Sequence, residues 1–176
     1  MSAPVSHLLV IGEREALAWI LREERMAFPA ARAASAGRLQ PGATLLMLTT
    51  RGCYHNPTRD RTLVIGESTV TSAPVFLEKP IRIARREFVM GCSLRIEKLA
   101  PIRHGVEVAP LVASLEVFSN KRAWSATLRQ TLVALGASDT RLLRAELESS
   151  VEPTPEARST YLDSIRPVRA LRAAEQ

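Results

Sequence analysis

The chain has 176 residues, of which 46% are hydrophobic, as expected of one globular domain with a buried core. No apolar run approaches the roughly 18 residues needed to cross a bilayer, and the N-terminus lacks the positive start and apolar centre of a secretory signal. Two cysteines are too few for a disulfide framework. We therefore expect a soluble, cytoplasmic domain with reduced thiols.

The net charge of +6 is concentrated in the central third of the chain. Between Arg51 and Arg103, ten arginines and lysines accompany five aspartates and glutamates. An excess of this kind favours a surface that faces a polyanion. A solvated, arginine-rich face without a partner explains the charge equally well.

The first third of the chain predicts strand, helix and strand. His7–Gly12 is an apolar run that ends at glycine, as buried strands do. Glu13–Arg25 is amphipathic at helical spacing, with Trp19 among its apolar positions. Met26–Gln40 has no clean period and is expected to be a loop with at most one helical turn. Ala43–Thr50 predicts a second buried strand.

The middle of the chain predicts a polar loop and several short strands. Arg51–Arg61 contains glycine, asparagine and proline as breakers and is expected to be a loop. Gly66 indicates a bulge or a close approach of backbone within the strand that follows. Extended segments are expected over Thr62–Ser72, Ile81–Ala84 at a sheet edge, Cys92–Leu99, Gly105–Pro110 and Leu115–Phe118.

The last third predicts two helices and a tail. One helix is expected over Lys121–Leu135, capped by Ser119 or Asn120, and the other over Asp139–Leu147, capped by Ser138. From Ser149 onward prolines interrupt the chain and polar residues dominate. We therefore expect one domain over residues 1–148, and over residues 149–176 a tail outside the core, either extended or a peripheral helix.

This order of elements favours an α+β fold. It lacks the strict alternation of strands and helices that builds a parallel nucleotide-binding sheet. A small, mixed, mostly antiparallel β-barrel with flanking helices fits the order better.

The sequence shows little that points to metal or covalent chemistry. His7, His55 and His104 have no partner at the spacing of metal ligands, and no cofactor-binding motif is present. Cys53 lies near Arg51 and His55 and is the one candidate nucleophile, with a buried structural thiol as the competing interpretation. We predict no metal, no cofactor and no catalytic residue.

Three short patterns are spaced as in a known family. They are Gly42 at the start of a buried strand, Ile65-Gly66 followed by Val70, Ser72 and Pro74, and Asn120 followed by Trp124, Leu128 and Arg129. Over roughly His7–Leu147 the chain resembles the EVE domains of the PUA-like superfamily, which also contains YTH and ASCH domains. It departs from their pattern at Ala43, where aspartate is usual, and at Leu48-Thr49-Thr50, where an aromatic residue is expected.

The resemblance implies a barrel whose concave face holds a nucleobase, often a modified one, lifted out of its strand. Such a pocket needs walls for stacking, polar groups for the base edge and cations for the flanking phosphates. The candidates are Phe28, Tyr54 and Trp124 as walls, Thr50, Asn56 and Asn120 for the base edge, and Arg25, Arg32, Arg51 and Arg61 for phosphates. Core packing is the competing interpretation for Phe28 and Trp124.

The sequence thus predicts a non-catalytic nucleic-acid-binding domain that recognises a modified or flipped base. DNA is expected before RNA, and a partner nuclease, where one acts, would be a separate chain. One alternative is an enzyme or sensor for a small nucleoside-like ligand that uses Cys53 and His55. Another is an interaction module that uses the tail Arg158–Gln176.

Overall fold

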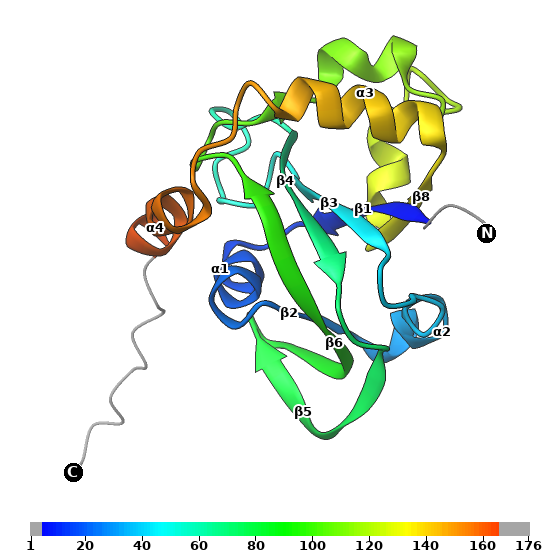
Figure 1. Cartoon of the computed structure of the whole chain (residues 1–176), viewed down its shortest axis with the longest axis vertical. Coiled ribbons are helices and arrows are strands. Elements are labelled where there is room, and N and C mark those ends of the chain that lie inside the picture. Colours follow the sequence, from blue (N-terminus) through cyan, green and yellow to red (C-terminus); the bar gives the residue numbers. More distant parts are fainter. Residues whose placement is uncertain (1–4, 166–176) are drawn as a thin grey trace.

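One mixed sheet organises residues 5–165, the part of the chain that the computed structural model describes (Figure 1). The strands run in the order β2-β6-β4-β3-β1-β8, while β5 pairs with β6 and β7 pairs with β4. The sheet curls into an open half-barrel, which confirms the predicted α+β, PUA-like fold. The strands are β1 (Ser6–Ile11), β2 (Arg25–Phe28), β3 (Thr44–Thr49), β4 (Leu63–Val70), β5 (Val75–Ile83), β6 (Arg86–Leu99), β7 (Val106–Glu107) and β8 (Leu132–Leu135).

Short helices connect and cover these strands (Figure 1). None of the helices within residues 5–165 has the length and apolar character that a membrane crossing requires. The α-helices are α1 (Arg14–Glu23), α2 (Ala33–Ala36), α3 (Ala137–Leu147) and α4 (Thr154–Ser164). The 3-10 helices are η1 (Ala30–Arg32), η2 (Ala109–Ser114) and η3 (Trp124–Arg129).

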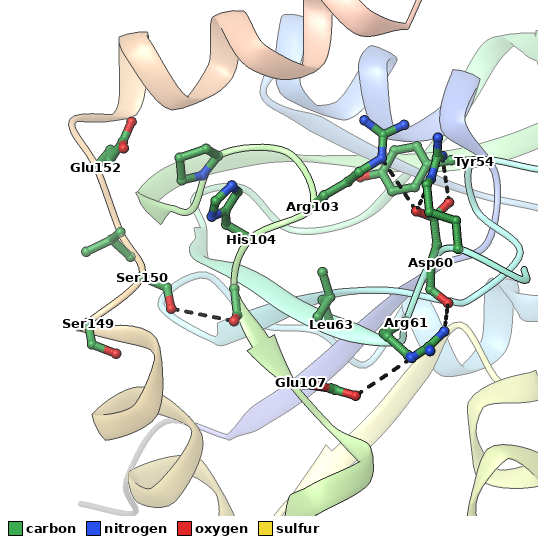
Figure 2. Close-up of a pocket in the computed structure, with 14 residues that line it drawn as sticks. Tyr54, Asp60, Arg61, Leu63, Arg103, His104, Glu107, Ser149, Ser150 and Glu152 are labelled. Atoms are coloured by element: carbon green, nitrogen blue, oxygen red, sulfur yellow. Dashed lines mark hydrogen bonds and ion pairs between the residues drawn. The ribbon is translucent and has the colours of Figure 1, made fainter. Parts of the chain in front are cut away.

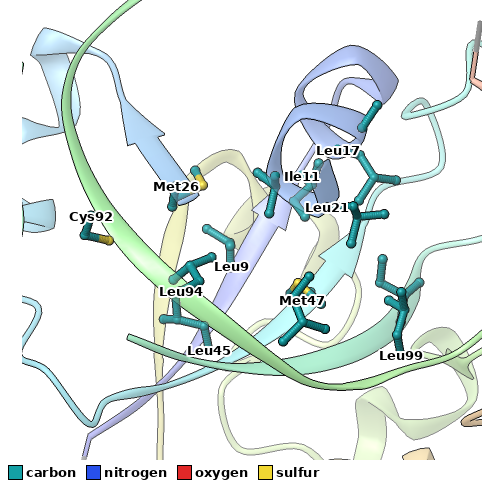
Figure 3. Packing of buried hydrophobic residues seen from close by; sticks show 14 of the residues in the cluster. Leu9, Ile11, Leu17, Leu21, Met26, Leu45, Met47, Cys92, Leu94 and Leu99 are labelled. Atoms are coloured by element: carbon teal, nitrogen blue, oxygen red, sulfur yellow. The ribbon is translucent and has the colours of Figure 1, made fainter. Parts of the chain in front are cut away.

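Strands β1 and β3 form the centre of the sheet and are its parallel pair, with Leu8 opposite Leu46. Both strands are covered on both faces, which explains their continuous apolar sequences. Because side chains alternate along a strand, successive residues enter two different cores. Leu9 and Leu45 lie on the face covered by α1 (Figure 3), where residues of α4 join the same core. Leu8 and Leu46 pack with η2, β8 and α3 on the other face.

Gly66 lies where β4 passes between two neighbouring strands, as the sequence indicated. A Cβ atom at this position would lie 2.8 Å from the Met47 methyl group and would also collide with the carbonyl oxygen of Lys98. The register of β4 shifts on both of its sides near this residue. Glycine therefore permits the close approach that curls the sheet.

Two strands lie where the sequence predicted other structure. Residues 25–28 form β2, which pairs antiparallel with β6 so that Met26 lies opposite Cys92. The predicted helix Lys121–Leu135 is also wrong: η3 ends at Arg129 and Leu132–Leu135 forms β8 on the free edge of β1. The Asn120 side-chain oxygen accepts the backbone N–H groups of residues 122 and 123 at 3.1 Å, as a cap would, but only the short helix η3, which begins at Trp124, follows it.

The extended segment expected at Leu115–Phe118 forms no strand. The buried carboxylate of Asp139 accepts the backbone N–H groups of Glu116 and Val117 at 2.9 and 2.8 Å. These two bonds satisfy backbone N–H groups that would otherwise need the carbonyl oxygens of a neighbouring strand. The N-cap position of α3 is Gly136, and Ser138, the expected cap, lies inside the helix.

Helix α4 belongs to the core, so the expectation that residues after 148 lie outside it is wrong for residues 149–165. Ala157, Tyr161 and Ile165 are buried in the cluster beneath α1, and the Tyr161 hydroxyl donates to the carbonyl oxygen of Ala100 at 2.7 Å. Arg158 pairs with Glu24 at 2.9 Å. The rest of the predicted tail, residues 166–176, lies outside the described residues.

We predict that Tyr161→Ala lowers the free energy of unfolding by about 3–5 kcal/mol, because it removes a buried aromatic ring and a buried hydrogen bond. Tyr161→Phe removes the hydrogen bond alone and is expected to cost about 1–2 kcal/mol. Ser159→Ala, on the exposed side of the same helix, is the control. Urea denaturation of the three variants is the measurement, and a Tyr161→Ala variant as stable as the control would contradict the assignment of α4 to the core.

Candidate functional site

The loop between β3 and β4, residues 50–62, is ordered by buried groups in its middle. Cys53 is fully buried, and its carbonyl oxygen accepts the backbone N–H of Arg14 at 2.9 Å. The His55 ring nitrogen Nε2 lies 3.1 Å from the Glu13 carboxylate. The loop is therefore tied to the start of α1, directly after β1.

Asp60 fixes the far end of this loop. Its carboxylate is buried and accepts two hydrogen bonds from the Arg59 guanidinium, at 2.9 and 3.0 Å, with Arg103 at 3.5 Å. The Arg59 hydrogen bonds are the main cause that holds the pKa of Asp60 below its ordinary value. The Arg103 guanidinium also stacks 5.6 Å from the centre of the Tyr54 ring. Because Asp60 contacts both Arg59 and Arg103, it joins the loop 50–62 to the turn 101–105.

A hollow lies between residues 54–63, the turn 101–105 and the segment 149–152 (Figure 2). We call it the Asp60 hollow, and its volume is about 550 Å³. Acidic and basic side chains alternate around it, and Arg61 lies 4.0 Å from Glu107. Its charged lining residues are Arg59, Asp60, Arg61, Arg103, His104, Glu107 and Glu152. The opposite charges partly offset one another.

A second depression, the Trp124 groove, consists of two adjoining hollows of about 410 and 440 Å³ that share Arg51, Thr62 and Trp124. The ring of Trp124 is half-buried and meets Phe118 edge to face, at 5.5 Å between centres and 72° between planes. Among residues 5–165, no acidic residue lines the groove. Its lining consists of Thr50, Arg51, Gly52, Pro57, Thr58, Arg61, Thr62, Ala109, Trp124, Ser125 and Leu128.

A third depression, the β1-end pocket, lies at the carboxyl end of β1 and has a volume of about 240 Å³. Its walls are mostly apolar, and the side chains of Glu13, Arg86 and Thr131 supply the polar and charged groups. The apolar walls come from Val10, Ile11, Ala16, Ile20, Met26, Ala27, Pro29, Ile83, Ala84 and Phe88. Such a pocket, with few polar groups on apolar walls, is the usual form of a ligand site.

The β1-end pocket and the Trp124 groove adjoin each other. Gly12 lines the pocket and Thr50 lines the groove. A Cβ atom on Gly12 would lie 3.7 Å from the Thr50 hydroxyl oxygen, and the Thr50 backbone N–H donates to Ile11 at 3.1 Å. Arg61 then links the groove to the Asp60 hollow, since it lines both.

The structure brings together four of the residues that the sequence selected, Thr50, Arg51, Arg61 and Trp124, in the Trp124 groove. Trp19 and Trp124 are both partly buried and pack against the core clusters.

Phe28 is wrong as a stacking wall, because it is fully buried in the core. Tyr54 is also largely buried, although it lines the Asp60 hollow.

The other predicted residues lie apart from these depressions. The Asn56 side-chain oxygen accepts the backbone N–H of Arg59 at 3.2 Å, which closes a turn. Arg32 donates to the carbonyl oxygen of Arg129 at 3.2 Å. Arg25 stacks 5.5 Å from the centre of Trp19. Within residues 5–165, none of the predicted residues Arg25, Phe28, Arg32, Asn56 and Asn120 lines any of the three depressions.

Sequence reasoning missed the β1-end pocket. Gly12-Glu13, directly after a buried strand, was the available signal, because ligands in α/β sheets gather at the carboxyl ends of parallel strands. Ile83 and Phe88 gave no such signal. They reach the pocket because the β5–β6 hairpin folds over α1 and β2, a long-range arrangement.

The thiol of Cys53 does not have the environment of a nucleophile. Burial is the largest cause that raises its pKa to about 12, and the nearby carboxylates of Glu13 and Asp60 act in the same direction. Burial likewise raises the pKa of Cys92 to about 11. Both thiols are therefore protonated at neutral pH, which removes the main support for an enzyme based on Cys53.

Comparisons with known proteins identify the fold. No protein-family model matches the sequence, and no curated protein matches it. Among solved structures, the YTH domain of Mmi1 in complex with RNA is 11% identical, with a TM-score of 0.54, covering 83% of this chain and 79% of that one. Human THYN1, in complex with DNA containing 5-methylcytosine, is 8% identical, with a TM-score of 0.51 and coverages of 81% and 97%. A Pseudomonas putida protein is 11% identical, with a TM-score of 0.53 and coverages of 80% and 97%. The chain therefore has the PUA-like fold that includes YTH domains.

We predict that Asp60→Asn lowers the free energy of unfolding by about 1–2 kcal/mol at pH 7, because it weakens the bonds to Arg59 and Arg103, which are partly screened by solvent. Since the pKa of Asp60 is lowered by folding, its contribution is complete above the ordinary value of 3.8 and is lost as the pH falls through the folded-state value. The difference between wild type and variant should therefore shrink below about pH 4.

Urea denaturation at pH 7, 4 and 3 measures this effect. Asp163→Asn, on the exposed side of α4, is the matched control. A stability difference for Asp60→Asn that is the same at pH 3 and pH 7 would show that charge is not its cause.

Proposed function

We propose that this domain binds nucleic acid without catalysing a reaction, and that it holds one unpaired base in the β1-end pocket. The observation that carries the proposal is an apolar pocket with few polar groups, placed directly beside a groove whose charged residues are all arginines. The pocket offers recognition of a base, and the arginines offer contacts to the flanking phosphates.

The pocket suits a base by its shape and chemistry. Phe88, Pro29 and Met26 provide apolar surface against a ring in a pocket of about 240 Å³. A base that enters such a concave pocket has left its stack, so it is unpaired or flipped. A methyl group on the base would be favoured by the apolar walls, which fits recognition of a modified base.

Glu13 gives the pocket its chemical preference. An ionised carboxylate accepts hydrogen bonds only, so it favours the exocyclic amino group of cytosine or adenine. His55 contacts both carboxylate oxygens, at 3.2 and 3.1 Å, and holds the side chain in place. The Thr131 hydroxyl can donate or accept a hydrogen bond with another polar atom of the base.

The solved structures of similar fold support a nucleic-acid partner for the proposal, because Mmi1 was solved with RNA and human THYN1 with methylated DNA. DNA is the polymer we would test first.

A small nucleoside-like ligand is the second candidate. It is favoured by the pocket lining itself, which carries one acidic and one basic side chain, Glu13 and Arg86.

We predict that Ala16→Leu weakens binding of short single strands about tenfold or more, because the larger side chain projects from α1 into the volume that the base would fill. Ala145→Leu, at an exposed position of α3, is the matched control and should bind as wild type does. Fluorescence anisotropy of labelled DNA and RNA strands is the measurement, with thermal melting to confirm folding. Equal affinities for the two variants would remove the pocket from the proposal.

We also predict that affinity falls with salt, with a slope of log K against log salt concentration of about −0.7 for each phosphate contacted. Arg51→Gln should make this slope shallower by about one phosphate contact. Arg141→Gln, at an exposed position of α3, should leave the slope unchanged. Binding that does not depend on salt would favour the small-ligand candidate.

A further inference from the structure

We propose that the Trp124 groove is a second nucleotide subsite, in which the base next to the one in the β1-end pocket stacks on Trp124. The inference rests on the proposed function and extends it, because it makes the ligand a single strand over at least two nucleotides. Three features of the groove carry it: its continuity with the pocket, the fixed aromatic ring and the one sign of its charge.

Continuity follows from the pairing of β1 with β3. The chain leaves β1 at Gly12, on the lip of the pocket, and leaves β3 at Thr50, on the lip of the groove. The backbone bond from Thr50 to Ile11 joins these two ends. A polynucleotide that places one base in the pocket therefore runs directly into the groove.

Trp124 packs against the core with part of its ring and leaves another part exposed in the groove. Phe118 packs edge-on against the ring, and Leu128 also lines the groove. Such support holds the ring in one orientation, so little entropy is lost when a second ring stacks on it. Stacking on an aromatic side chain is tolerant of sequence, because every base presents a π-face.

The charges of the groove fit a phosphate backbone. Arg51 is exposed and makes no ion pair with any residue between 5 and 165. Arg61, at the other end, reaches Glu107 only at 4.0 Å. Four hydroxyl side chains provide further donors along the path, from Thr50, Thr58, Thr62 and Ser125.

The lining whose charged residues are all arginines ends at Arg61. Beyond it lies the Asp60 hollow, where Asp60, Glu107 and Glu152 offset the charges of the arginines. We therefore expect the phosphate contacts to lie along the groove, where no carboxylate among the described residues offsets the arginines. A paired neighbour in a duplex cannot offer its face to Trp124, and the domain should therefore prefer single strands.

The test compares Trp124→Leu with Trp124→Phe, using short single strands of DNA and RNA with cytosine, 5-methylcytosine or adenine at the centre. Trp124→Leu should weaken strand binding about tenfold, because it removes one stacked base, whereas Trp124→Phe keeps a ring and should retain most of the affinity. Neither change should alter binding of the corresponding nucleoside 5′-monophosphate. A strand with an abasic site beside the central base should bind both variants and wild type alike.

A second measurement does not depend on the folding of these variants. In Trp19→Phe, the remaining tryptophan emission comes from Trp124. A single strand should quench this emission, while the nucleoside monophosphate and the abasic strand should not.

The outcomes separate the two proposals. If Ala16→Leu abolishes strand binding and Trp124→Leu binds as wild type does, the subsite is wrong and the pocket stands. If Trp124→Leu abolishes binding and Ala16→Leu has no effect, the groove binds nucleotides and the pocket assignment is wrong. Duplexes that bind as tightly as single strands would overturn the subsite.

Discussion

The parallel pairing of β1 with β3 is the constraint on which the rest of the molecule depends. Parallel strands end at the same edge of a sheet, so the two chain segments that follow them emerge side by side. Here these segments are Gly12-Glu13, which leads into α1, and the loop 50–62. This pairing therefore places the pocket, which begins after β1, next to the groove, which begins after β3.

The same pair of strands also determines which surfaces the rest of the fold must cover. Central strands apolar on both faces must be covered on both faces. Helix α1 alone leaves part of one face open, and α4 completes it through Tyr161 and Ile165. The other face is closed by β8, α3 and η2, with buried Asp139 holding the loop beneath them. The C-terminal segment is therefore part of the layer that keeps β1 and β3 in place, and with them the site.

Local patterns in the sequence predicted those elements whose stability is local. The buried strands at His7–Gly12 and Ala43–Thr50 and the helix after the first of them were found because their periodicity lies within one segment. The helix predicted over Lys121–Leu135 was wrong, because the last residues of this segment pair with the free edge of β1 as strand β8. Phe28 failed as a wall because β2 pairs with β6, which places the ring inside the core. Arg51 and Trp124, both selected from the sequence as candidate ligand contacts, line the same groove, whereas Asn56, selected with them, closes a turn instead.

Under the proposed function, the pocket and the groove have different roles because their charges differ. Phosphate contacts position a nucleic acid and carry no sequence information, whereas contacts to base edges specify it. A carboxylate such as Glu13 repels phosphates and accepts hydrogen bonds from amino groups. Within a chain of net charge +6, the proposed role of Glu13 is to keep the backbone out of the pocket and to accept a hydrogen bond from the edge of a base. The proposed role of Arg51 and Arg61, which lie outside the pocket, is to bind the phosphates that flank this base.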